Sequence, residues 1–135
     1  MKRLFFLALG LAPILAVVPA AAHHSYTMFD MQKTVALDAS VVRFKWQNPH
    51  AFIETDVAAR GATERWAIEM TSPNNLAQEG WKRTSLKAGE QISVRIAPLR
   101  NGNTGGLFLD LRKPDGRVLD SGLPKNGTPV NVPQL

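Results

Sequence analysis

Apolar and polar residues alternate along much of the chain, which is the pattern of half-buried β-strands. In residues 35–46 the apolar positions are mainly odd-numbered as far as Val41 and even-numbered from Val42 onward. Because successive residues of a strand point to opposite faces, this change of phase predicts a β-bulge or strong coiling. Four shorter alternating runs predict further strands, at residues 52–57, 66–70, 92–96 and 107–111.

A short helix is expected between the third and fourth of these strands. Ser72 is a good N-cap, Pro73 suits the first helical position, and Gly80 can end the helix in a left-handed conformation. Asp115-Gly116 predicts a tight hairpin turn after the fifth strand, with residues 117–119 returning. This order predicts an all-β fold with one short helix, a five-stranded OB-like barrel; an open β-sandwich is the alternative.

The expected core collects the apolar residues on one face of each strand and one residue of the helix. These residues are Val41, Phe44, Ile53, Val57, Trp66, Ile68, Leu76, Ile92, Val94, Ile96, Leu109 and Leu111.

The first 22 residues have the features of a cleavable secretion signal. Lys2 and Arg3 precede an uncharged apolar run over residues 4–18, and Ala20-x-Ala22 fits the small-residue rule for signal peptidase. The run is short for a membrane span of about 20 residues. We therefore expect three regions: a signal peptide at 1–22, a barrel domain at 23–120 and a disordered tail at 121–135. The mature protein is expected in the periplasm or secreted, with no transmembrane anchor.

Composition narrows the class of protein further. Cleavage after residue 22 of 135 leaves 113 residues, the size of one domain. Removal of Lys2 and Arg3 from 16 basic residues leaves 14 against 11 acidic ones, too mild an excess to argue for a nucleic-acid partner. The absence of cysteine excludes disulfides, thiolate metal sites and thiol nucleophiles.

Several segments carry recognisable motifs: His23-His24-Ser25-Tyr26 at the mature start, W-x-NPH at 46–50, GW-x-R-x-x-L-x-x-G at 80–89 and PDGR at 114–117. Together they resemble a family of small exported bacterial proteins, catalogued as a domain of unknown function, whose members typically begin HHSF. Tyrosine replaces the usual phenylalanine at position 26. The resemblance spans about residues 23–119; it implies export and a compact β domain, and it implies no particular activity.

The three histidines of the chain, His23, His24 and His50, all lie in these motifs. An N-terminal histidine chelates metal through its α-amine and a ring nitrogen, and a second imidazole from His24 or His50 would complete a nitrogen-rich set that suits Cu(II). Met28 and Met31 could add sulfur ligands for Cu(I). The alternative is that the histidines are a solvated terminus and an unrelated loop residue.

A second candidate site combines aromatic and basic residues, with Trp46, Trp81 and Arg83 as its expected ligand-binding members. Arg43, Lys45 and Lys82 lie near them in sequence. OB barrels bind ligands on an exposed sheet face with side chains of these kinds. The alternative is that both tryptophans fill the ends of the barrel and the cations are solvated.

Common catalytic motifs are missing from the sequence, including G-x-S-x-G, H-E-x-x-H and a phosphate-binding glycine loop. Its carboxylates, Glu69 among them, mostly fall on solvent-facing strand positions. We therefore expect a periplasmic binding module without enzymatic activity, whose ligand is copper or is otherwise unknown. The alternative is a metal-free module that binds a small ligand or an envelope protein through the face that carries Trp46, Trp81 and Arg83, called here the Trp/Arg face.

Overall fold

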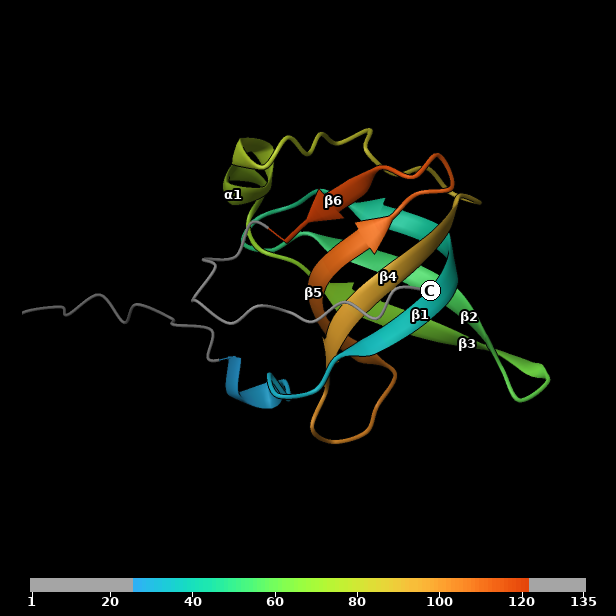
Figure 1. Ribbon diagram of the computed structural model, residues 1–135. Helices are drawn as coiled ribbons and strands as arrows, with labels where there is room; N and C mark the ends of the chain where they lie inside the picture. The colour runs from blue at the N-terminus through green and yellow to red at the C-terminus, as the bar shows by residue number, and fades with distance from the viewer. Residues whose placement is uncertain (1–25, 122–135) are drawn as a thin grey trace, which may run out of the picture.

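The computed structural model describes residues 26–121, and its strands form one twisted sheet that closes on itself (Figure 1). The elements, in chain order, are η1 (Tyr26–Met28), β1 (Val35–Lys45), β2 (Phe52–Ala59), β3 (Ala62–Glu69), α1 (Pro73–Gln78), β4 (Gln91–Pro98), β5 (Gly105–Arg112) and β6 (Val118–Asp120). Residues 1–25 and 122–135, which contain the expected signal peptide and most of the expected tail, lie outside the described residues. Ser121, the first residue of that expected tail, is buried.

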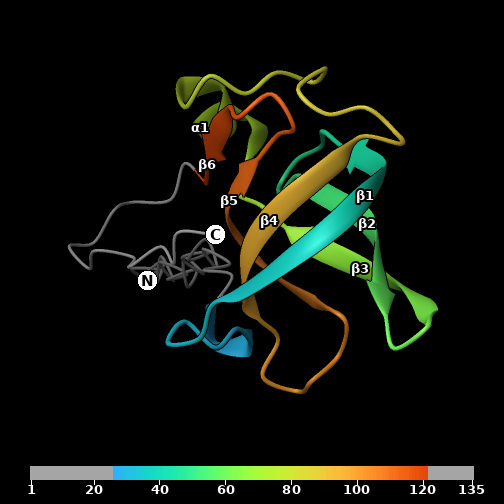
Figure 2. The same ribbon diagram turned by 45° about the vertical axis from the view of Figure 1, so that its right-hand side comes forward.

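The sheet has the strand order β3-β2-β1-β4-β5-β6, and a parallel pairing of β3 with β5 closes five of the strands into a barrel. Figures 1 and 2 show β1 and β4 side by side on one wall, with β2 and β3 behind them. The remaining neighbours in the barrel pair antiparallel, and β6 extends β5 beyond the closure. The predicted five-stranded all-β barrel with one short α-helix is confirmed.

β1 is shared between two neighbours, and it bends where the hydrophobic phase changes. Its first half pairs with β4 from Val35 to Ser40, and its second half pairs with β2 from Ala39 to Lys45. The register with β2 shifts between Val41 and Arg43, so one residue is left over as a bulge. The phase change in the sequence therefore predicted this bulge correctly.

The short helix begins and ends at the expected residues. The Ser72 hydroxyl accepts a hydrogen bond from the Asn75 N–H at 3.3 Å, and Pro73 is the first helical residue. Gly80 has a φ of 87°, a left-handed conformation that glycine adopts without a steric penalty. The helix buries Leu76, whose carbonyl also accepts from the Trp81 N–H at 3.0 Å. The helix thus buries two apolar side chains, those of Pro73 and Leu76, and directs the chain back toward the barrel.

The core contains most of the predicted residues, along with two aromatic rings, Trp81 and Phe108, that are outside the expected core list. Nine of the twelve expected residues are buried, while Phe44, Trp66 and Leu109 are partly buried. Trp81 is only 2% exposed and packs against Phe44 and Phe108, with ring centroids 5.7 Å and 5.5 Å apart. Its Nε1–H donates to the Asp120 carbonyl at 2.8 Å, which joins the segment after α1 to β6.

The expected core face of β5 requires a correction. Leu111 lies in the main core as predicted, but Leu109 packs instead against a smaller cluster that includes Leu107 and Phe29. The cause is a register shift between Arg95 and Ile96 of β4, which leaves Leu109 as an extra residue on β5. The shift turns Phe108 into the main core.

Within residues 26–121 no helix is long and apolar enough to cross a membrane. The Asp115-Gly116 turn connects β5 to β6 as predicted, and Lys113 and Arg117 close it through a backbone hydrogen bond of 2.9 Å.

Candidate functional site

His50 lies in the loop between β1 and β2, directly after the cis peptide bond between Asn48 and Pro49. Two backbone hydrogen bonds hold the next residue, Ala51, against the chain that follows β3: its N–H donates to the Thr71 carbonyl at 3.2 Å, and its carbonyl accepts from the Met70 N–H at 2.9 Å. Ala51 is fully buried. The loop is therefore anchored where the imidazole begins.

The His50 ring pairs with the carboxylate of Glu69, the last residue of β3. Nδ1 of His50 lies 2.5 Å from Oε1 of Glu69, and the two side chains are 22% and 21% exposed. Because a carboxylate can only accept, the bridging proton is carried by Nδ1, and in the neutral ring the lone pair is then on Nε2. A carboxylate that orients a histidine in this way is common behind metal-bound imidazoles.

The other residues of the expected metal site are not brought to His50 by the described structure. His23 and His24 lie outside the described residues. Met28 and Met31 are each about half exposed. Within residues 26–121 no group of three or more histidine or acidic side chains could hold a metal ion. A metal site of three or more such ligands that includes His50 would therefore need ligands from outside the described residues.

The expected Trp/Arg face is divided between core and surface. Trp81 is buried and cannot present a ring face to a ligand, so the alternative interpretation, a tryptophan that fills the barrel, fits it better. Trp46 is partly buried and packs edge-to-face on Phe44 at 5.7 Å. Arg83 is exposed, and its Nη1 donates to the Trp46 carbonyl at 3.2 Å. This bond joins the 80–89 segment to the W-x-NPH segment at one end of the barrel.

The basic residues that precede Trp46 on β1 are engaged with an acid on β2. Lys45 forms a close ion pair with Glu54, and Arg43 lies 3.8 Å from the same carboxylate. The hydrogen bond from Lys45, with the positive charges of both residues, lowers the pKa of Glu54. These two cations are therefore partly neutralised by β2.

Glu69 is the residue that sequence reasoning missed as a partner of His50. The Arg60-Gly61 dipeptide between β2 and β3 contained the necessary signal, because a two-residue hairpin turn there pairs residue 52 with residue 69. His50 precedes Phe52 by two residues and therefore lies close to Glu69. Periodicity alone placed Glu69 on the solvent side and gave it no partner.

The chain is thus a small, closed β-barrel whose α-helix lies between β3 and β4. A family model described as a family of unknown function (DUF6152) matches residues 12–110, and the chain belongs to this family. No curated protein and no solved structure matches the chain significantly.

Proposed function

We propose that the mature chain is an exported β-barrel binding module that holds Cu(II) between its N-terminus and His50. The observation that carries the proposal is the pairing of His50 with Glu69 at 2.5 Å. The module acts by binding, without catalytic turnover of its own.

The proposal assigns different tasks to the terminus and to the folded domain. After cleavage behind Ala22, the amine and imidazole of His23 form a chelate that needs no help from the fold. A second imidazole converts this local affinity into a site only if it is held in place. His50 meets this condition, because the hydrogen bonds of Ala51 anchor its backbone and Glu69 orients its ring. His24 is the other source of a second imidazole.

Export rests on the N-terminal sequence and has its own test. Lys2-Arg3, the apolar run and the Ala20-x-Ala22 site predict a mature protein that begins at His23. Intact mass spectrometry of the protein from the native cell envelope should give the mass of residues 23–135. A species that begins at Met1, or after His24, would contradict both the cleavage site and the chelate.

Copper binding is tested by calorimetry and thermal melting of the mature protein and three variants. One variant has an extra N-terminal residue, which displaces the His23 amine and keeps every side chain; the others are His50→Ala and Glu69→Gln. We expect Cu(II) to raise the melting temperature of the wild type, since the native state gathers ligands that the unfolded chain does not. Glu69→Gln should weaken binding about 10- to 100-fold, as loss of a carboxylate behind a metal ligand does.

A matched control is Glu64→Gln, which removes the same charge from an exposed position of the same strand. This variant should bind copper like the wild type. If all the proteins bind equally and copper shifts no melting temperature, the histidines are not a site and the copper proposal is wrong.

The metal-free module remains the second candidate, and the Arg83–Trp46 contact favours it. This contact ties the Arg83 guanidinium to the backbone of Trp46, whose indole packs on Phe44. A guanidinium and an indole close together suit stacking and hydrogen bonding to a ligand or partner protein. If the protein binds its ligand or partner without copper, and Arg83→Gln abolishes that binding, this candidate is favoured over copper.

A further inference from the structure

A cleft of about 720 Å³ lies between the segment that follows α1 and the hairpin that joins β5 to β6. Two motif segments of the sequence, 80–89 and 114–117, supply most of its wall, although they are far apart in the chain. Among the described residues that line the cleft, four are cationic and one is acidic: Lys82, Lys87, Lys113, Arg117 and Glu90. The cleft therefore has an excess of positive charge in a concave setting.

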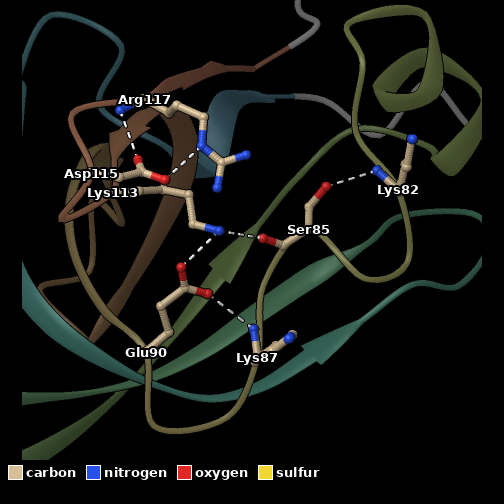
Figure 3. A network of polar contacts seen from close by, with 7 residues as sticks. All are labelled: Lys82, Ser85, Lys87, Glu90, Lys113, Asp115 and Arg117. Atoms are coloured by element: carbon tan, nitrogen blue, oxygen red, sulfur yellow. Dashed lines mark hydrogen bonds and ion pairs between the residues drawn. The ribbon is translucent and has the colours of Figure 1, made fainter.

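The most buried cation of the cleft is Lys113, whose side chain is 10% exposed. Its ammonium group donates to the Ser85 carbonyl at 2.8 Å and lies 2.7 Å from Oε1 of Glu90 (Figure 3). Oε2 of Glu90 accepts from the Lys87 N–H at 3.2 Å. Both carboxylate oxygens of Glu90 therefore have partners within the cleft, and its negative charge is offset by Lys113. An ammonium has three hydrogens, and these two acceptors use two of them.

The cations at the rim are less constrained. Lys82 and Lys87 are exposed, and within residues 26–121 no carboxylate pairs with either ammonium group. Arg117 pairs with Asp115 at 2.7 Å on the exposed hairpin. The Ser85 hydroxyl already accepts from the Lys82 N–H at 2.8 Å, so its own hydrogen can be donated to a ligand. The rim therefore offers charged and neutral donors and few competing acceptors.

We propose that this cleft binds a small molecule that carries two or more phosphate or carboxylate groups. Its volume falls in the range of small-molecule sites, about 300–1,000 Å³, and exceeds the needs of a single oxyanion. Lys82 and Lys87 both line the cleft and lie on either side of Ser85 in the sequence, so a ligand with separate anionic groups has two exposed cations to pair with. Leu119 and Ala88 add apolar wall for the body of the ligand. The inference depends neither on copper nor on the N-terminal histidines.

The test uses the mature protein in metal-free buffer of low ionic strength, with inorganic pyrophosphate and citrate as probes in calorimetry. Vesicles with and without phosphatidylglycerol form a further arm, because a lipid headgroup carries the same phosphate chemistry. The cleft variant is Lys82→Gln/Lys87→Gln, which leaves the backbone N–H groups of both residues in place. The matched control, Lys33→Gln/Arg60→Gln, removes the same charge from exposed positions outside the cleft.

We expect pyrophosphate or citrate to bind the wild type and the control alike, and the cleft variant to bind about tenfold more weakly. Binding should weaken as salt is added, because exposed charges are screened. Binding to phosphatidylglycerol vesicles alone, lost in the cleft variant, would overturn the polyanionic small molecule and identify a lipid headgroup as the ligand. An equal loss in the control variant would show only net-charge attraction and overturn the site. Failure of both anions and of the vesicles to bind the wild type would overturn it as well.

Discussion

Gly106 is a residue at which the close packing of β5 on β4 can be tested directly. β5 must approach β4 and β3 at the same place, where Gly106 pairs with Pro98 on one side and with Ile68 on the other. A Cβ atom at Gly106 would lie 2.6 Å from the Ala97 carbonyl oxygen and 2.7 Å from Cδ1 of Ile96. The backbone of Gly106 is outside the left-handed region, so alanine brings no conformational strain of its own.

Two effects of opposite sign decide the outcome of Gly106→Ala. Replacement of glycine by alanine at an unstrained position stabilises a protein by about 0.4–1 kcal/mol, because the unfolded chain loses freedom. Insertion of a methyl group into a packed interior costs about 1–3 kcal/mol, and occasionally more. The contact is with a backbone oxygen of β4, which cannot move without disturbing the β4–β5 pairing. We expect the upper part of that range to apply, for a net loss of about 2 kcal/mol.

The assay is urea unfolding of the mature protein, followed by tryptophan fluorescence. Gly106→Ala should lower the midpoint without changing the slope, and should lower the melting temperature by about 8–16 °C. Gly105→Ala is the matched control, because its Cβ would lie 2.8 Å from Cδ1 of Leu99, the movable end of a side chain, and 3.0 Å from the Ala67 carbonyl oxygen. This control should lose less. A Gly106→Ala protein as stable as the wild type would refute the close packing of β5 against β4 described above.

Two further predictions concern packing and charge in the barrel wall. Ile68 is fully buried, so Ile68→Ala should lower the free energy of unfolding by about 2–5 kcal/mol in the same urea assay; a loss below about 0.5 kcal/mol would mean that β3 presents its other face to the core. The pKa of Glu54 is lowered, chiefly by its hydrogen bond to Lys45, so the stability from this pair is present above the ordinary carboxyl pKa of about 4.3 and is lost as the pH falls through the folded-state pKa. The stability difference between the wild type and Lys45→Met should accordingly shrink on acidification, and a difference that stays constant down to about pH 2 would contradict the assigned pair.

The sequence by itself determined the features that depend on neighbouring residues. The phase change after Val41 predicted the bulge in β1, because the period of a strand is two and only an extra residue can reverse it. Ser72, Pro73 and Gly80 predicted both ends of α1, since each satisfies or terminates the local backbone of a helix. With the strand order, these local signals were enough to predict the barrel.

Only the tertiary structure decided which residues meet across the barrel. The bulge in β5 opposite Arg95 turns Phe108 rather than Leu109 into the main core. The bulge follows the stretch of β5 that pairs with both β3 and β4, and the residues near it in the sequence do not predict this double pairing. Trp81 lies outside the alternating runs of the sequence, so periodicity did not predict its burial. It is buried because the loop after α1 returns to the barrel. The joining of residues 80–89 to the β5–β6 hairpin likewise depends on the packing of distant segments. The pairing of His50 with Glu69 follows from the register of the β2–β3 hairpin, which brings residues 19 apart in sequence together. Contacts between distant segments depend on the whole packing, whereas turns, caps and periodicity are properties of the local chain.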